Sequence, residues 1–179
     1  MMRRAVFLDR DGVLNRAVIR AGRPHSPASP DELEVLPGVA ESLAALKAAG
    51  FCLVVVTNQP DVARGTTAPD MVRAIHQRLQ ACLPLDGVFT CPHDDADACE
   101  CRKPRPGLLH EAANRLHIDC ASSFMVGDRW RDIEAGRQAG CTTLFVDRGY
   151  DEPRPSSYDH RVTCLSDAAR VILHSRHRQ

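Results

Sequence analysis

Aromatic residues, net charge and long apolar runs are all scarce in this chain of 179 residues. Phe, Trp and Tyr make up 4% of it, and 23 basic side chains balance 23 acidic ones. Because nucleic-acid binding relies on a basic surface, the neutral balance disfavours a nucleic-acid partner. No apolar run approaches the roughly 20 residues of a membrane-spanning helix, so no membrane partner is expected.

The N-terminus also lacks the features of an export signal. Only the short apolar stretch 5–8 follows Met-Met-Arg-Arg before an aspartate, which is too short for a signal peptide and predicts a cytoplasmic protein. A hydrophobic fraction of 44% and a charged fraction of 26% are typical of a globular protein. The length predicts one sizeable domain over residues 1–179, and we expect a monomer.

Short apolar runs alternate with helical patterns along the chain. Candidate strands are 4–8, 51–56, 87–90, 122–126, 142–146 and 160–164, and candidate helices are 37–49, 69–82, 106–116, 131–139 and 166–174. This alternation, with continuously apolar strands, predicts an α/β fold: a Rossmann-like parallel sheet with helices on both faces. Segments 22–30 and 149–159 are expected to be ordered surface loops, and residues 174–179 to fray.

The eight cysteines fall into two groups. Five are scattered singly in apolar or element-end contexts, where a free cysteine behaves as a small hydrophobe; they are Cys52, Cys82, Cys120, Cys141 and Cys164. The other three gather around a histidine, as Cys91, His93, Cys99 and Cys101. Three thiolates and one imidazole form the closed tetrahedral set of a structural Zn²⁺ site, and the alternative is a disulfide within the cluster.

Polar residues follow three of the apolar runs at the points where strands should end. They are Asp9-Arg10-Asp11-Gly12, Thr57-Asn58-Gln59 and Gly127-Asp128-Arg129. In an open parallel sheet the ligand lies beyond the carboxyl ends of the strands, so these groups should share one site. Asp9 and Asp11 lie on the same face of an extended segment and would repel each other unless a cation sits between them. The alternative for this stretch is a surface turn.

Three carboxylates and a hydroxyl in one site suit Mg²⁺ and a phosphate group. Asp9 can act as a nucleophile that forms an aspartyl-phosphate, and Asp11 is near enough to serve as general acid and base. Asp128 completes the acidic set, and Thr57 can hold phosphate oxygens.

Two cations directly follow the cysteine cluster. Lys103 can supply a point charge to a phosphate, and Arg102 can grip a second anionic group with two hydrogen bonds. The alternative is a solvated surface pair. Their position between a metal site and a predicted helix favours a functional role.

Four stretches resemble, in order, the four motifs of the haloacid dehalogenase superfamily of phosphotransferases. They are FLDRDGVLN (7–15), VVVTNQPDVARG (54–65), CRKPRPG (101–107) and VGDRWRDIEAG (126–136). The resemblance implies that Asp9 is the nucleophile and Asp11 the general acid/base. It also implies phosphate stabilisation by Thr57 and Lys103, Mg²⁺ ligation by Asp9, Asp11 and Asp128, and a supporting role for Asp132.

The zinc loop, residues 91–103, is similar to that of a subgroup whose members dephosphorylate heptose bisphosphates or histidinol phosphate. Residues 36–65 resemble the heptose-bisphosphate members, and this resemblance implies removal of the 7-phosphate of D-glycero-D-manno-heptose 1,7-bisphosphate, a step toward the lipopolysaccharide core. The five-residue spacer between His93 and Cys99 resembles the histidinol phosphatases, which stay the alternative. By this resemblance the substrate-binding residues are Asp9, Arg10, Asp11, Arg20, Thr57, Asn58, Gln59, Arg102, Lys103 and Arg129.

The motifs leave no room for a separate cap domain, so an open site is expected. Two hypotheses of other kinds compete with a sugar phosphatase. A catalytically silent, zinc-stabilised binding module would show a damaged motif, and none is damaged. A nucleic-acid end phosphatase has a similar TNQ motif, but the neutral charge and the zinc loop disfavour it.

Overall fold

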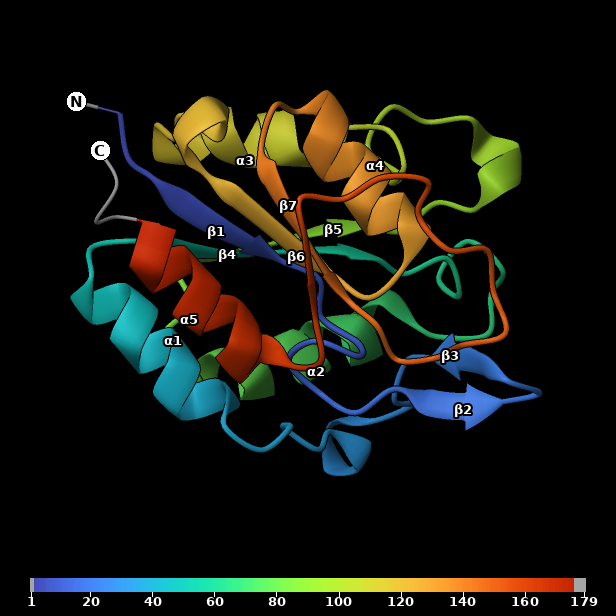
Figure 1. Ribbon diagram of the computed structural model, residues 1–179. Coiled ribbons are helices and arrows are strands. Elements are labelled where there is room, and N and C mark those ends of the chain that lie inside the picture. The colour runs from blue at the N-terminus through green and yellow to red at the C-terminus, as the bar shows by residue number, and fades with distance from the viewer. Residues whose placement is uncertain (1, 176–179) are drawn as a thin grey trace.

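Residues 2–175 are described by a computed structural model, which is built around one parallel sheet (Figure 1). Its strands are β1 (Ala5–Leu8), β4 (Cys52–Asn58), β5 (Gly87–Cys91), β6 (Phe124–Gly127), β7 (Thr142–Val146) and β8 (His160–Val162). They lie in the order β5-β4-β1-β6-β7-β8, and every neighbouring pair is parallel. The predicted parallel α/β sheet is confirmed.

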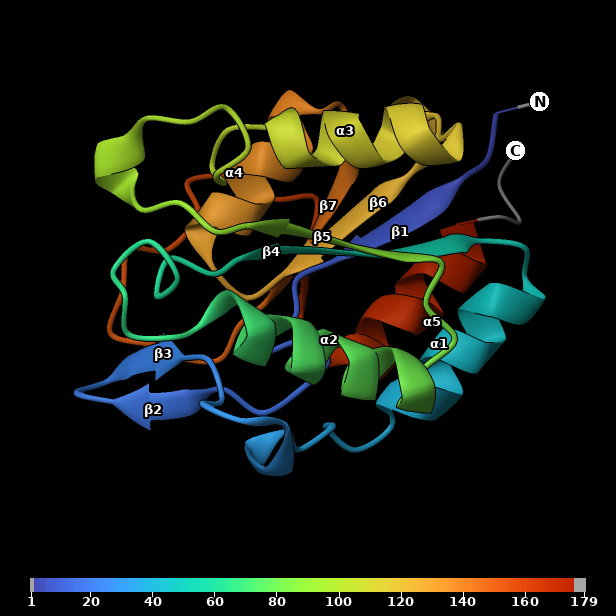
Figure 2. The ribbon, with the colours of Figure 1, turned by 180° about the vertical axis from the view of Figure 1, so that it is seen from behind.

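Helices cover both faces of the sheet, as the alternating pattern predicts (Figures 1 and 2). One face carries α3 (Gly107–Leu116) and α4 (Trp130–Gln138), and the other carries α1 (Val39–Ala48), α2 (Pro69–Cys82) and α5 (Leu165–Ser175). Each helix lies within about two residues of its predicted range. Three short 3-10 helices join them: η1 (Pro30–Glu32), η2 (Asp95–Asp97) and η3 (Cys120–Ser122).

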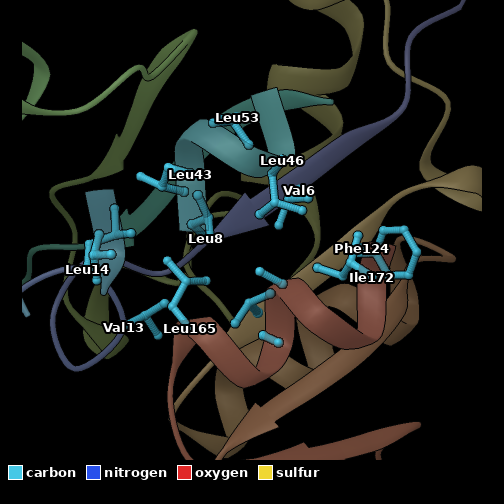
Figure 3. Packing of buried hydrophobic residues seen from close by; sticks show 14 of the residues in the cluster. Val6, Leu8, Val13, Leu14, Leu43, Leu46, Leu53, Phe124, Leu165 and Ile172 are labelled. Carbon is cyan, nitrogen blue, oxygen red and sulfur yellow. The ribbon is translucent and has the colours of Figure 1, made fainter. Parts of the chain in front are cut away.

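The central strand β1 is buried on both faces, which accounts for its continuous apolar run. Val6 and Leu8 pack into a core with residues of α1 and α5, part of which is seen in Figure 3. Ala5 and Phe7 point the opposite way, into a second core with residues of α3 and α4. These two cores fix the strand, and with it the position of Asp9 at its carboxyl end.

A small hairpin lies outside this sheet, in a region where only a loop was expected. β2 (Val18–Arg20) and β3 (Arg23–His25) pair antiparallel across Ala21 and Gly22. Both turn residues have positive φ angles, +49° and +74°, as a two-residue hairpin turn requires. The expectation that 22–30 is a loop throughout is therefore wrong at residues 23–25, because such short, exposed strands carry no alternating apolar pattern.

The hairpin and the zinc loop lie at the same end of the molecule, beyond the carboxyl ends of the strands (Figures 1 and 2). Segment 149–159 runs along this end without regular secondary structure, as predicted. No helix within residues 2–175 is long and apolar enough to span a membrane. Of the C-terminal residues expected to fray, 176–179 fall outside the described range.

Candidate active site

Three carboxylates meet at the carboxyl ends of the two central strands. Asp9 directly follows β1 and Asp128 directly follows β6, and the Asp9 amide donates to the Val126 carbonyl at 3.0 Å. Asp132 joins them from the first turn of α4. The side chains are buried, and one oxygen from each lies within 4.8 Å of the other two. The predicted meeting of motif residues at this end of the sheet is confirmed for Asp9 and Asp128.

Lys103 is the cation that neutralises this cluster. Its Nζ lies 2.8 Å from Asp9 Oδ1 and 2.7 Å from Asp132 Oδ1, and it donates to the Val56 carbonyl at 2.7 Å. Burial alone would lower the pKa of Lys103, but the two carboxylates outweigh it and raise that pKa above its usual range. A side chain that is 1% exposed is thus held as a charged ammonium beside Asp9.

The backbone of Lys103 is fixed by the polar residues at the carboxyl end of β4. Asn58 donates to the Lys103 carbonyl at 3.0 Å and accepts from the Lys103 amide at 3.1 Å. Thr57 lies next to it, buried, and its hydroxyl oxygen accepts a hydrogen bond from Gln59 at 2.9 Å. Asn58 therefore orients the loop that carries Lys103, although it was predicted as a substrate contact.

Asp9 keeps one oxygen available. Burial and the negative charge of Asp132 raise its pKa to about 6, against the opposing effect of Lys103. Oδ1 is held by Lys103, whereas Oδ2 accepts no hydrogen bond from the described residues. A pKa of about 6 leaves Asp9 ionised at neutral pH, and because Asp9 lines a cavity its Oδ2 is free to react.

Asp128 shows the clearest need for a cation. Both of its oxygens are buried with no hydrogen bond resolved among the described residues, and the neighbouring Tyr150 hydroxyl is the side chain that comes nearest to supplying one. Burial and the charges of Asp9 and Asp132 raise its pKa well above the ordinary value. The loop after β1 closes tightly over it: a Cβ on Gly12, whose φ is +86°, would lie 1.8 Å from Asp128 Oδ2. Unpartnered buried carboxylate oxygens beside Asp9 fit a magnesium ion held by two carboxylates.

The structure does not bring the Asp11 carboxylate into this metal-binding set, although it was predicted there. Arg10 binds it through two hydrogen bonds of 3.1 and 3.0 Å, and Asn15 and Ser26 donate to it at 2.9 and 2.7 Å. Burial alone would raise the pKa of Asp11, but Arg10 and these hydrogen bonds lower it. Asp132 takes its place among the carboxylates around Asp128.

Arg10 is completely buried, and its second anchor comes from α2. Its Nη1 lies 3.0 Å from Nε2 of His76. Because a guanidinium can only donate, Nε2 must accept, and the imidazole is neutral. Burial first and then the Arg10 charge lower the pKa of His76 to about 4. Sequence reasoning missed His76, whose only signal is a histidine beside the apolar residues Val72, Ile75 and Leu79 of α2.

The four predicted zinc ligands form a second cluster, and that prediction of position is confirmed. The sulfur and Nδ1 atoms of Cys91, His93, Cys99 and Cys101 lie within 4.8 Å of one another. The contacts resolved between them range from 3.1 to 3.6 Å. Tetrahedral zinc with Zn–S bonds of about 2.3 Å would place neighbouring sulfurs about 3.8 Å apart, so these residues fit Zn²⁺ with little movement.

Arginine–aspartate pairs hold the zinc loop against the rest of the molecule. Asp95 lies 2.8 Å from Arg102 and 2.9 Å from Arg131 of α4. Asp94 accepts two hydrogen bonds from Arg64, at 2.6 and 2.8 Å. Arg102 also donates to the His93 carbonyl at 3.1 Å. The zinc cluster and these pairs together fix the segment that continues into Lys103.

A cavity of about 310 Å³ opens over the carboxylates, within the size range of ligand sites. Of the predicted residues, Asp9, Asp11, Thr57, Asn58, Arg102, Lys103 and Arg129 line it. Arg10 and Gln59 lie beneath the wall, where they hold Asp11. Arg20 is not at the cavity, whereas its register partner Arg23 is. The sequence also gave no indication of His25, Ser26, Arg64 and Arg131 as lining residues.

Comparisons with known proteins agree with this geometry. Residues 25–140 match the haloacid dehalogenase-like hydrolase family. Two curated relatives are named D-glycero-beta-D-manno-heptose-1,7-bisphosphate 7-phosphatase. The Pasteurella multocida protein is 40% identical over 83% of this chain and 84% of its own. The Escherichia coli K12 protein is 38% identical over 80% of this chain and 78% of its own.

A solved structure shares the whole architecture. It is the D,D-heptose 1,7-bisphosphate phosphatase of Bordetella bronchiseptica in complex with magnesium and phosphate. It is 33% identical to this chain, aligns with a TM-score of 0.82, and the match covers 96% of this chain and 99% of that one.

Proposed function

Because the chain belongs to the haloacid dehalogenase-like hydrolase family, we propose that it removes the 7-phosphate of D-glycero-D-manno-heptose 1,7-bisphosphate in a magnesium-dependent reaction. The observation that carries the chemistry is Asp9: one oxygen is held by Lys103, the other is free, and the unpartnered Asp128 carboxylate lies beside it. The names of the relatives support the substrate. This step supplies heptose for the lipopolysaccharide core.

In the proposed first step, Asp9 Oδ2 attacks phosphorus while the bond from phosphorus to the sugar oxygen breaks, which leaves an aspartyl-phosphate. Lys103 keeps Asp9 ionised and places positive charge beside the phosphate oxygens, and Thr57 holds one of them. Magnesium, held by Asp9 and Asp128, would neutralise charge on the phosphate oxygens.

Asp11 serves as acid and then as base in this proposal. It gives a proton to the departing sugar oxygen and afterwards takes one from the water that hydrolyses the aspartyl-phosphate. Arg10 holds Asp11 ionised, which suits the second step directly. The first step requires its carboxylate, which lines the cavity, to carry a proton and turn from Arg10 toward Asp9.

The zinc loop gives the site its stability rather than its chemistry. Cys91, His93, Cys99 and Cys101 would fill all four positions of a tetrahedral zinc ion and would leave none for water or substrate. We propose that the loop positions Lys103, and that Arg102 and Arg129 contact the sugar end of the substrate. Both arginines already bind carboxylates, Asp95 and Glu152, so each meets the substrate with its remaining N–H groups.

Three further features belong to the proposal. We expect residues 1–179 to form one phosphatase domain that acts as a monomer on a small phosphorylated sugar. Neither nucleic acid nor a membrane is a partner in this proposal. A zinc site with three thiolates suits a reducing compartment, so we place the enzyme in the cytoplasm.

A side-by-side assay tests this function. The values of kcat/KM are measured with magnesium for heptose 1,7-bisphosphate, histidinol phosphate and p-nitrophenyl phosphate. We expect the bisphosphate to exceed the other two by roughly a hundredfold, since two phosphates can be bound at once. Faster turnover of histidinol phosphate would replace the proposal with the histidine-pathway alternative, and no turnover of any of the three would contradict phosphatase chemistry.

A further inference from the structure

We propose that Arg23 of the β2–β3 hairpin binds the second phosphate of the substrate, the one that is not hydrolysed. The inference rests on the proposed function, because it requires a substrate with two phosphates. It assigns to an exposed hairpin arginine a role in substrate selection that neither Arg102 nor Arg129 can fill as well.

The cavity wall carries several cations, and nearly all of them are already paired with carboxylates. Its cationic residues are Arg23, Arg64, Arg102, Lys103, Arg129 and Arg131. Arg64 binds Asp94, Arg102 and Arg131 share Asp95, Arg129 binds Glu152, and Lys103 binds Asp9 and Asp132. Within residues 2–175, the guanidinium of Arg23 has neither an ion pair nor a hydrogen bond.

This difference decides which arginine can receive a phosphate most easily. A phosphate that approaches Arg64, Arg102, Arg129 or Arg131 must compete with a carboxylate whose distance from the guanidinium is 2.5–2.9 Å. At Arg23 it displaces only water. The arginine can then offer two parallel hydrogen bonds to the phosphate oxygens, the geometry that makes such contacts strong.

The hairpin places Arg23 away from the reacting centre. Arg23 and His25 are two residues apart on β3, so they share a face, and both line the cavity. The next residue, Ser26, donates its one hydroxyl hydrogen to Asp11 at 2.7 Å, and its oxygen also lies 2.9 Å from Gln59 Oε1. Three residues of extended chain span about 10 Å, so the backbone of Arg23 lies about that far along the hairpin from Ser26, the residue that contacts Asp11.

The hairpin is anchored at both ends, which keeps Arg23 at the cavity. Ser26 holds its base against Asp11, and the Asp151 amide donates to the Gly22 carbonyl at the turn, at 3.2 Å. A guanidinium presented on a fixed strand loses less freedom on binding than one on a loose loop.

Arg20 provides a matched control on the same hairpin. It pairs in register with Arg23, carries the same charge and is also exposed, but it does not line the cavity. A loss that followed from reduced net charge alone would be the same for Arg20→Ala and Arg23→Ala. A loss that followed from a direct contact would be confined to Arg23→Ala.

The experiment measures kcat/KM for heptose 1,7-bisphosphate and p-nitrophenyl phosphate in wild type, Arg23→Ala, Arg23→Lys and Arg20→Ala. For the bisphosphate we expect about a tenfold loss in Arg23→Ala, a smaller loss in Arg23→Lys, and less than about a twofold loss in Arg20→Ala. The loss on the monophosphate in Arg23→Ala should be several times smaller. Melting temperatures check that each variant is folded.

Two results would overturn the inference while leaving the proposed function intact. One is active wild type with equal bisphosphate losses in Arg23→Ala and Arg20→Ala. The other is an Arg23→Ala loss that is the same on both substrates. If wild type does not hydrolyse the bisphosphate at all, the proposed function fails, and the inference fails with it.

Discussion

The contact between His76 and Arg10 predicts a pH dependence of stability that can be assigned to one side chain. The pKa of His76 is lowered from 6.5 to about 4 in the folded protein. The unfolded chain therefore takes up a proton at a higher pH than the folded one. Neutral His76 therefore contributes its full stability to the folded state above pH 6.5, and this contribution is lost as the pH falls from 6.5 toward 4.

The size of the His76 pKa shift determines how much the free energy of unfolding changes with pH. A difference of about 2.5 pKa units corresponds to about 3 kcal/mol over the whole window, at 1.36 kcal/mol per unit. Between pH 7.5 and pH 5.0 the free energy of unfolding should fall by about 2 kcal/mol through this residue. His76 is only 8% exposed, so solvent screening should reduce this value little.

His76→Gln is the matched variant, because its amide oxygen can still accept from Arg10 but cannot be protonated. Urea unfolding of both proteins is followed at pH 7.5 and pH 5.0. Asp9, with a pKa raised to about 6, acts in the opposite direction, but it is present in both proteins and cancels. The wild type should lose about 2 kcal/mol more than the variant. If the free energy of unfolding fell equally in both proteins, His76 would not be a neutral, buried histidine in the folded state.

Three further predictions concern the site itself. Asp9→Asn keeps the shape but removes the nucleophile, so turnover should become undetectable; wild-type activity would exclude the covalent mechanism. Cys99→Ser should lower the melting temperature and the zinc content from about one ion per chain, whereas Cys82→Ser, at an exposed cysteine outside the cluster, should do neither. Arg102→Ala should lower kcat/KM for the bisphosphate roughly tenfold and for p-nitrophenyl phosphate less. Equal losses on the two substrates would show that Arg102 stabilises the zinc loop but does not contact the substrate.

The sheet could be predicted from the sequence because its strands are buried on both faces. The runs 5–8 in β1 and 52–56 in β4 are continuously apolar, and each is followed by the polar residues that the fold brings together. The zinc cluster could be predicted because three cysteines and one histidine at this spacing can form very few kinds of site. In both cases a strong local pattern coincides with a strong physical constraint.

The remaining features depend on contacts between distant segments. The Asp11 carboxylate is held by Arg10, whose other contact is His76, 66 positions along the chain from Arg10. The pattern of the sequence does not distinguish Arg20 from Arg23, and only the folded chain shows that Arg23 lines the cavity while Arg20 does not. The carboxylate partners of Arg102 and Arg129 are likewise visible only in the folded chain.

The most direct test of the proposed activity follows both phosphates of heptose 1,7-bisphosphate by phosphorus NMR while the wild-type protein acts with magnesium. The proposal predicts that the resonance of the 7-phosphate disappears as inorganic phosphate grows, while the 1-phosphate resonance persists. Asp9→Asn, measured in the same way, should leave both resonances unchanged. Initial loss of the 1-phosphate, or no loss of either under conditions where the protein is folded, would contradict it.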